Sequence, residues 1–256
     1  MAGRALDYSY LAPQFPLAIA HRGGAGDWPE NSLMAFQSAY DLGFRYMETD
    51  VHLTSDGQVV AFHDVTLDRL EGSAVSIRDL PWQQIQRLKL AQDSRVPLMA
   101  ELFEALPDAR FNIDMKCDEV VDPMIDLVVT HQAQERVCLA SFSDKRIRRV
   151  RERLGNAVCV SAGRAAVTLQ VLRSRGLPGR PSYPPVLQVP IKRYGLPVLT
   201  RALVERCHRD GKHVHVWTIN DAKEMSRLLD LGVDGIVTDY PSRLRQVMRD
   251  KGLWED

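Results

Sequence analysis

Short apolar β-type runs alternate with helix-like segments along this whole chain, and that repeat constrains its fold more than any other feature. Eight runs are expected to be strands: residues 17–21, 44–53, 111–116, 137–141, 157–161, 186–189, 213–218 and 235–239. Seven segments are expected to be helices: residues 31–42, 119–131, 144–154, 164–175, 200–210, 221–231 and 241–249. An eightfold strand–helix repeat in 256 residues is the count of a TIM (β/α)8 barrel.

The competing α/β architecture is a doubly wound open sheet. That fold usually has fewer strands, and its first strand leads into a glycine loop that binds phosphate. Here the first strand is followed by His21-Arg-Gly-Gly-Ala-Gly26, which does not have the GxGxxG spacing. We therefore expect one barrel domain over residues 1–256.

Two segments depart from the repeat. Residues 54–110 are too long for one crossover, open with the hairpin signal Asp56-Gly57, and are expected to form an inserted subdomain with its own strand and with helices at 79–88 and 98–106. Residues 177–197 hold six prolines and are expected to form a rigid loop. A contact with a substrate chain or a membrane is the alternative for that loop.

Composition excludes several classes of function. Thirty-three basic and thirty-three acidic residues cancel, so no global field would attract nucleic acid.

The run of cations at 145–153 is expected to be a solvated outer helix packed through Ile147 and Val150, with an anionic partner as the alternative. Cys117, Cys138 and the other two cysteines show no CxxC spacing, which favours buried thiols in a reducing compartment.

No stretch approaches the roughly 18 apolar residues needed to span a bilayer, and the first 20 residues lack the pattern of a signal peptide. We therefore expect a cytoplasmic protein without stable membrane insertion. Nothing in the sequence indicates an oligomeric state.

Polar residues collect where the expected strands end. In a TIM barrel the catalytic groups lie at the C-terminal ends of the strands, whose inner positions are apolar. The residues at these ends are His21, Arg22, Glu48, Asp50, Asp114, Lys116, Ser141, Gln188, Trp217 and Asp239. One rim of the barrel is therefore the expected site.

Residue parity makes a metal site the favoured interpretation of the carboxylates. Glu48 and Asp50 are two apart on one strand and share a face, as do Asp114 and Lys116. Three carboxylates converging at the barrel mouth would repel one another unless a cation lay between them. Oxygen ligands favour Mg²⁺, Ca²⁺ or Mn²⁺ over zinc. Salt bridges to Lys116 and Arg22 are the structural alternative.

Two histidines complete the candidate site. His21 ends a buried strand, and His63 follows an apolar run and precedes Asp64, which could orient its ring. We expect His52 to lie too far out, His213 and His215 to belong to the barrel core, and His131 and His208 to lie on helix surfaces. Asn31 is either a helix cap or part of the site.

These motifs resemble the glycerophosphodiester phosphodiesterase family. The resemblance runs in order over about residues 17–245. It is carried by His21-Arg-Gly23, Pro29-Glu-Asn-Ser32, Glu48-Thr-Asp-Val51, Leu53-Thr-Ser-Asp-Gly57, His63-Asp64, Asp114-Met-Lys116, Ser141-Phe142, Val216-Trp-Thr-Ile-Asn220 and Asp234-Gly-Ile-Val-Thr-Asp-Tyr-Pro241.

The resemblance implies a TIM barrel that hydrolyses small-molecule glycerophosphodiesters to glycerol 3-phosphate and an alcohol. Its implied metal ligands are Glu48, Asp50 and Asp114, its acid–base pair is His21 and His63, its phosphate-binding cations are Arg22 and Lys116, and the wall of its glycerol pocket is Trp217. The third carboxylate is usually glutamate in this family, whereas this chain has an aspartate at position 114.

Two other functions compete with this one. A lysophospholipase D would use the same metal and histidines on diesters that keep an acyl chain, with a wider apolar groove near residues 177–197. A non-catalytic barrel that binds phosphorylated ligands would usually have lost a histidine or a carboxylate, and none is missing here.

Overall fold

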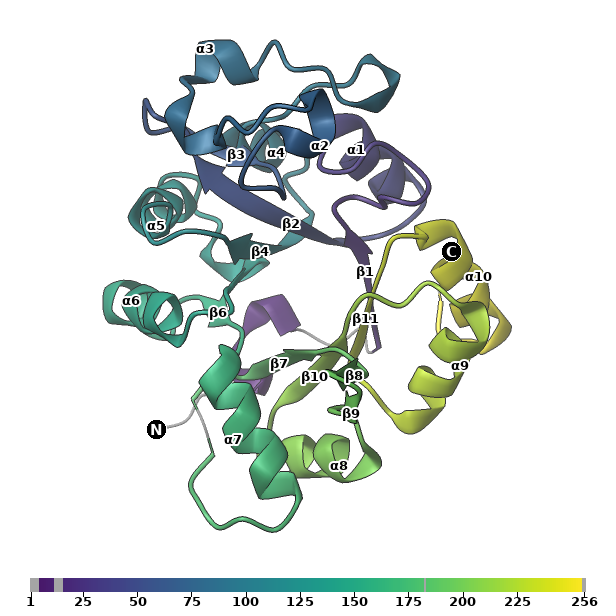
Figure 1. The fold of residues 1–256 in the computed structure, drawn as a ribbon. Coiled ribbons are helices and arrows are strands. Elements are labelled where there is room, and N and C mark those ends of the chain that lie inside the picture. Colours follow the sequence, from purple (N-terminus) through teal and green to yellow (C-terminus); the bar gives the residue numbers. More distant parts are fainter. Residues whose placement is uncertain (1–4, 12–15, 182, 255–256) are drawn as a thin grey trace.

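Eight parallel strands form a nearly closed barrel in the computed structural model, which describes residues 5–11, 16–181 and 183–254 (Figure 1). The strands are β1 (Leu17–His21), β2 (Tyr46–Leu53), β4 (Arg110–Met115), β5 (Val137–Ala140), β6 (Cys159–Val160), β7 (Val186–Val189), β10 (His213–Val216) and β11 (Gly235–Thr238). Their order is β6-β5-β4-β2-β1-β11-β10-β7, and a parallel bridge between Ser161 and Val186 joins the two end strands. The predicted barrel and all eight predicted strands are confirmed.

Helices surround the barrel as an outer layer (Figure 1). They are α1 (Leu33–Asp41), α5 (Val121–Thr130), α6 (Asp144–Leu154), α7 (Arg164–Ser174), α8 (Arg201–Arg209), α9 (Ala222–Leu231) and α10 (Pro241–Asp250). Four of them begin after a residue whose side chain accepts a backbone N–H of the first turn: Ser32, Ser143, Thr200 and Asp221. The interpretation of Asn31 as the cap of α1 is therefore wrong, because the hydroxyl of Ser32 occupies that position.

The segment between β2 and β4 packs on its own small core. It contains β3 (Val59–Ala61), α2 (Asp68–Glu71), η3 (Ile77–Asp79), α3 (Trp82–Ile85), η4 (Ala91–Asp93) and α4 (Met99–Ala105). Its buried apolar side chains are Val60, Phe62, Leu67, Ile77, Ile85, Leu88 and Val96. The Asp56-Gly57 turn joins β2 to antiparallel β3, as predicted, with Gly57 at a φ of 81°.

The predicted helix at 79–88 is wrong in extent. Leu80 and Pro81 have extended backbone, since the residue before a proline disfavours the helical region, so η3 ends before them and α3 is a single turn. The predicted helix at 98–106 corresponds to α4.

The N-terminal end of the barrel is closed by η1 (Ala5–Asp7) and η2 (Ser9–Leu11). Tyr10 and Leu11 pack with Leu17 and Ile19 in one apolar cluster, and the Tyr46 hydroxyl donates to the Tyr10 carbonyl at 2.8 Å. This end is therefore filled, which leaves the opposite, C-terminal rim for ligands.

The basic run at 145–153 lies on α6 and faces carboxylates of α5. Arg146 donates to Asp118 at 2.7 Å, and Arg149 donates to Asp122 at 2.9 Å through its Nε. A third pair, Arg153 with Asp126, continues the ladder, while Ile147 and Val150 are buried. Most of these cations thus find anionic partners within the chain, on α5 and on the turn that precedes it.

The thiols and core histidines lie largely where the sequence placed them. All four cysteines are free, and only Cys117 is partly exposed rather than buried. His213 and His215 lie buried in β10, as expected. Neither ring nitrogen of His215 has a hydrogen-bond partner among the described residues.

We expect acid to destabilise the protein through His215. Burial lowers the pKa of this imidazole from 6.5 to about 3, so the unfolded chain takes up the proton first. Stability present above pH 6.5 is therefore lost as the pH falls toward 3, by about 3–5 kcal/mol. Urea unfolding between those pH values should give a flatter dependence for His215→Leu. An equally steep dependence in that variant would contradict the assignment.

A buried ion pair ties α7 to the end of α8. Arg173 is 3% exposed and donates to Asp210 at 2.7 Å. Replacing Asp210 by alanine would leave this cation buried without its counter-charge, so we expect a loss of about 3–5 kcal/mol in the free energy of unfolding. Asp230→Ala, which removes the partner of Lys251 at an exposed site, should cost at most about 1 kcal/mol. Equal losses in the two variants by urea denaturation would contradict this prediction.

Candidate active site

His21 is held by the carboxylate of Asp239, which follows the last strand of the barrel. Its Nδ1 lies 2.5 Å from Asp239, which follows β11, and Asp239 in turn accepts a hydrogen bond from the Asn220 amide at 2.7 Å. Burial opposes a charge on the ring, but Glu48 and the Asp239 hydrogen bond together raise the pKa of His21 above its usual value. The Nε2 of His21 faces Glu48 at 3.6 Å.

Glu48 and Asp50 lie on the same face of β2, because side chains two residues apart on a strand point to the same side. Both are almost fully buried. Burial, with the adjacent charge of Asp50, raises the pKa of Glu48 to about 7. Asp50 Oδ1 is 2.6 Å from the Lys116 ammonium. Its Oδ2 is 3.2 Å from Arg22 Nε but has no aligned hydrogen bond.

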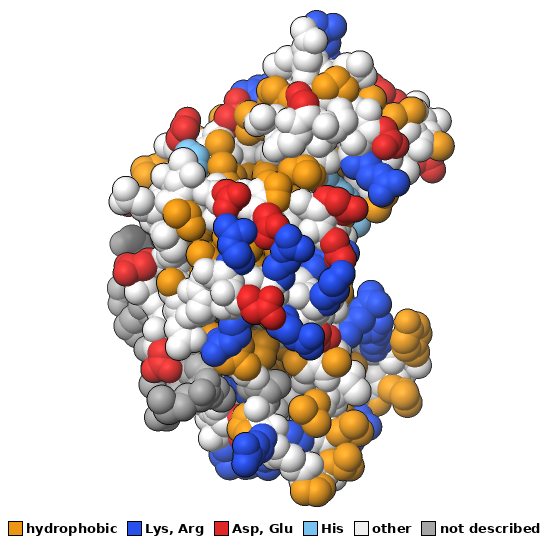
Figure 2. All heavy atoms as spheres, turned by 90° about the vertical axis from the view of Figure 1, so that its left-hand side faces the viewer, with side chains coloured by type: hydrophobic (Ala, Val, Ile, Leu, Met, Phe, Trp, Pro, Cys, Tyr) orange, Lys and Arg blue, Asp and Glu red, His pale blue; other side chains and the backbone are white. Residues whose placement is uncertain are grey.

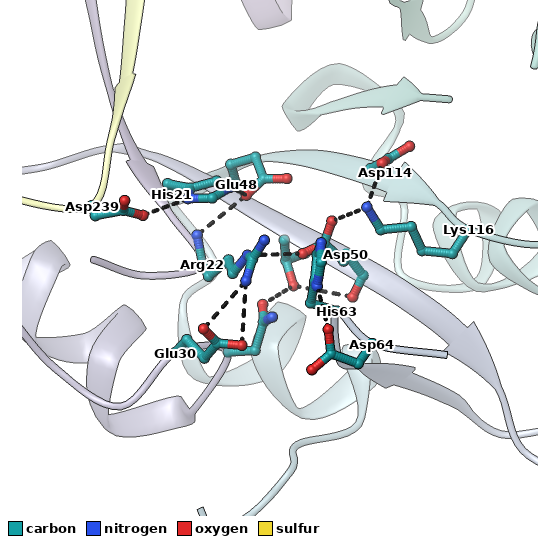
Figure 3. Close-up of polar contacts among 12 residues, drawn as sticks. His21, Arg22, Glu30, Glu48, Asp50, His63, Asp64, Asp114, Lys116 and Asp239 are labelled. Carbon is teal, nitrogen blue, oxygen red and sulfur yellow. Dashed lines mark hydrogen bonds and ion pairs between the residues drawn. The ribbon is translucent and has the colours of Figure 1, made fainter. Parts of the chain in front are cut away.

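Lys116 follows β4 and lies between two carboxylates (Figure 3). Its Nζ is 2.6 Å from Asp50 and donates to Asp114 at 2.8 Å. Burial opposes the ammonium charge, but Asp114 and Asp50 outweigh it and raise the pKa of Lys116. Burial also raises the pKa of Asp114 in spite of that neighbour. The lysine charge therefore lies between these two carboxylates.

His63 lies across Asp50 from His21 (Figure 3), at the exit from β3. Its Nδ1 is 2.8 Å from Asp64, and the other oxygen of Asp64 accepts from Arg69 Nε at 2.7 Å. Arg69 also pairs with Glu30, which binds Arg22 at 3.2 Å. The inserted segment thus supplies one histidine and is tied to the first barrel loop by ion pairs.

The loop after β1 depends on its glycines. Gly23 and Gly24 have φ values of 79° and 105°, and a Cβ on Gly24 would lie 2.7 Å from Pro241. Arg22 has a φ of 51°, which is uncommon for a residue with a side chain, and its backbone N–H donates to Glu48 at 3.2 Å. The tight loop thereby turns the Arg22 guanidinium toward Glu30 and Asp50 (Figure 3).

Two hollows flank the cluster. One of about 190 Å³ is lined by Glu30, Asn31, Asp64 and Arg69 among others. The other, of about 310 Å³, is lined by Asp114, Lys116, Ser141, Phe142, Arg146 and Arg164 among others. The Trp217 ring meets Phe142 edge-on at 5.8 Å, so an aromatic pair stands beside the second hollow.

The carboxylates of the rim are the candidate donors for a divalent cation. In the described ranges, no group of three or more His, Cys, Asp or Glu side chains is already arranged to hold a metal ion. Glu48 and Asp50 nevertheless fit one, because both are buried oxygen donors and Asp50 Oδ2 has no hydrogen-bond partner. Asp114 could join them only if Lys116 moved away from between Asp50 and Asp114.

The structure brings the predicted site residues together at one rim and places Asp64 against the His63 ring, as the sequence analysis expected. It also adds residues to which the sequence analysis gave no role. Asp239 and Asn220 hold His21, and the Glu30–Arg69 pair holds Arg22 and Asp64. Asp239 stood at a predicted strand end and within the family-like segment 234–241, but neither signal assigned it to His21. The His52 Nε2 donates to the His63 carbonyl at 3.2 Å, so His52 supports the His63 loop.

Comparison with known proteins gives a consistent set of matches. The model of the glycerophosphoryl diester phosphodiesterase family matches residues 21–243. A probable glycerophosphodiester phosphodiesterase 2 from Mycobacterium tuberculosis is 38% identical and covers 93% of each chain. A glycerophosphodiester phosphodiesterase from Caldanaerobacter subterraneus is 31% identical, over 92% of this chain and 99% of its own. Human lysophospholipase D GDPD1 is 28% identical, over 90% and 85%.

Solved structures share the fold. A putative glycerophosphoryl diester phosphodiesterase from Silicibacter pomeroyi superposes with a TM-score of 0.81 at 21% identity, covering 96% of this chain and 98% of its own. An Oleispira antarctica phosphodiesterase, solved in complex with its product sn-glycerol-3-phosphate, has a TM-score of 0.77 at 22% identity, over 92% and 97%.

Proposed function

Because the chain belongs to the glycerophosphoryl diester phosphodiesterase family and is a phosphoric diester hydrolase, we propose a specific substrate class and mechanism for it. It hydrolyses glycerophosphodiesters to glycerol 3-phosphate and an alcohol, with His21 and His63 as the acid–base pair. The reaction uses one divalent cation, Mg²⁺ or Ca²⁺, with Mn²⁺ as a further candidate. Residues 1–256 act as one domain with the subdomain 54–110 inserted, in the cytoplasm.

One observation supports the mechanism above all others: two histidines, each held through Nδ1 by a carboxylate, lie on opposite sides of Glu48 and Asp50 (Figure 3). A bound Nδ1 fixes the tautomer and leaves Nε2 to exchange a proton. One histidine takes a proton from the attacking hydroxyl, and the other gives a proton to the departing alkoxide oxygen.

The cations of the site bind the phosphoryl group. Arg22 and Lys116 would hold its non-bridging oxygens, because both place a cation beside Asp50 at the centre of the site. A divalent cation held by Glu48, Asp50 and Asp114 would supply Lewis-acid stabilisation of the charge that develops on those oxygens. Lys116 would then leave its place between Asp50 and Asp114 and turn toward the phosphate.

A phosphodiester has two arms, and the site has a hollow on each side of the catalytic cluster. Trp217 would line the glycerol pocket, on the side of Phe142. The hollow lined by Glu30, Asn31 and Asp64 would take the other arm. Each hollow has room for a group of the size of glycerol or an amino alcohol.

Turnover of soluble and lipid diesters tests this function. Purified protein should release choline and glycerol 3-phosphate from glycerophosphocholine. Exclusive turnover of lysophosphatidylcholine would overturn the primary proposal in favour of a lysophospholipase D, the name that relatives at 28% identity carry. No turnover of either substrate with Mg²⁺ or Ca²⁺ present would support the non-catalytic alternative.

A further inference from the structure

A short hairpin of unusual composition follows β7 at the same rim as the proposed site. It consists of β8 (Lys192–Arg193) and β9 (Leu196–Pro197), joined by Tyr194 and Gly195. Tyr194 is 89% exposed and Leu196 is 67% exposed, more than any other large hydrophobic side chain among the described residues. Exposed apolar side chains that share one patch are typical of surfaces that bind a partner, and these two lie two residues apart on one hairpin.

The chain segment that contains the hairpin carries charges of one sign, although the whole chain is neutral. Residues 153–204 contain eight Lys and Arg residues and no Asp or Glu. Lys192 and Arg193 are exposed on the hairpin itself, and Arg193 lies over the Tyr194 ring at 5.2 Å from its centroid. A basic face with apolar tips complements a surface that is both anionic and apolar.

The hairpin shares its surroundings with the mouth of the barrel. Arg164, at the first residue of α7, stacks over Phe142 and lines the larger hollow with Lys116. The hydrogen bond and charge of Arg193, with a smaller part from Arg164, lower the pKa of Tyr194, so the tip of the hairpin lies within the field of that rim. Figure 2 shows the molecule hollowed at its right-hand edge, with Lys and Arg side chains beside the hollow and Asp and Glu side chains among them.

The backbone of the hairpin is anchored from both sides. The carbonyl of Ile191 accepts from Val198 N at 3.0 Å and from Leu199 N at 3.2 Å, which closes its base. The carbonyl of Pro197 accepts from Arg175 at 2.9 Å, which ties it to the end of α7. Tyr194 and Leu196 are therefore presented outward on a fixed support.

We propose that the 192–197 hairpin docks this enzyme on an anionic lipid surface. Lys192 and Arg193 contact the headgroup phosphates, and Tyr194 and Leu196 enter the boundary between headgroups and acyl chains, where amphipathic aromatic rings are favoured. A second copy of the chain fits less well, since pairing two such hairpins would bring like charges together.

This inference rests on the proposed function, because docking would bring the active site to diesters held in a lipid surface. Binding to vesicles does not depend on turnover, however, so the two can fail separately. Glycerophosphocholine hydrolysis measured in parallel reports on the active site alone.

The test is sedimentation with vesicles of pure phosphatidylglycerol or pure phosphatidylcholine. The wild-type protein should bind phosphatidylglycerol vesicles and not phosphatidylcholine vesicles, and 1 M salt, at which the screening length is about 3 Å, should release it. Lys192→Gln with Arg193→Gln should weaken the binding by about 25-fold, at about fivefold per cation. Tyr194→Ser with Leu196→Ser should weaken it roughly tenfold or more.

Matched controls separate the hairpin from bulk charge and bulk apolarity. Arg87→Gln with Arg148→Gln removes two exposed cations elsewhere, and Val129→Ser removes an apolar side chain that is 47% exposed on α5. These controls should bind as the wild type does, and every variant should hydrolyse glycerophosphocholine at the wild-type rate. Absence of wild-type binding, or equal binding by hairpin and control variants, would overturn the proposal. So would a dimer, seen by sedimentation velocity, that the Tyr194/Leu196 variant loses.

Discussion

Replacing His21 by alanine is expected to lower kcat for glycerophosphocholine by about 10²–10⁴-fold, the usual contribution of one acid–base group. The physical reason is its position, since Asp239 holds Nδ1 at 2.5 Å and leaves Nε2 directed toward the carboxylates. His63→Ala should cause a loss of similar size, because its ring is held by Asp64 in the same way. Steady-state rates at saturating substrate measure both effects.

The control must separate chemistry from folding. His208→Ala removes an exposed imidazole that pairs with Asp234 away from the site, and it should keep the wild-type kcat. Circular dichroism and urea unfolding should show that His21→Ala retains the fold, since the ring stands at the rim of the barrel and not in its core. A folded His21→Ala variant that kept most of its turnover would remove His21 from the mechanism.

Much of the barrel could be predicted because its causes are local. Most strands are short runs rich in apolar residues, and several helices begin at a polar cap or end at a glycine, as α9 does at Asp221 and Gly232. Active sites of TIM barrels lie at the C-terminal ends of the strands. This rule predicts that His21, Glu48 and Asp50 lie in one site, even when no side-chain contact is known. The same rule reached Asp239 but could not assign it to His21.

What failed or was missed depended on contacts between distant segments or on neighbouring residues competing for one position. Asn31 and Ser32 both suit a cap, and only the direction of the backbone decides that Ser32 binds Ala35 N. The Arg69–Glu30 pair joins residues 39 apart in the chain, so no spacing rule reveals it. The sequence analysis left two places for Lys116, beside a phosphate or in salt bridges with the carboxylates, and the structure puts its ammonium between Asp50 and Asp114.

Removing divalent cations is expected to abolish turnover, and adding Mg²⁺ or Ca²⁺ is expected to restore it. The reason is electrostatic, because Glu48 and Asp50 are adjacent, buried and acidic, and burial with the Asp50 charge raises the pKa of Glu48 to about 7. A bound cation would relieve that repulsion and hold both groups ionised. Dialysis against a chelator, followed by assays with each metal, measures the effect; unchanged activity after chelation would refute the metal assignment.

Metal binding itself should be measured beside activity, because the carboxylates have distinct expected contributions. Glu48→Gln should weaken Mg²⁺ or Ca²⁺ binding in calorimetry by more than the roughly 10–100-fold typical of an outer-shell partner. Asp114→Asn should weaken metal binding only if the Lys116 ammonium moves away from between Asp50 and Asp114 when the metal binds. In the structure that ammonium donates to Asp114 at 2.8 Å. Full metal affinity in Asp114→Asn would restrict the site to the two carboxylates of β2 and leave Lys116 where it lies. Weakened affinity would instead mean that the cation and the lysine exchange positions when the metal binds.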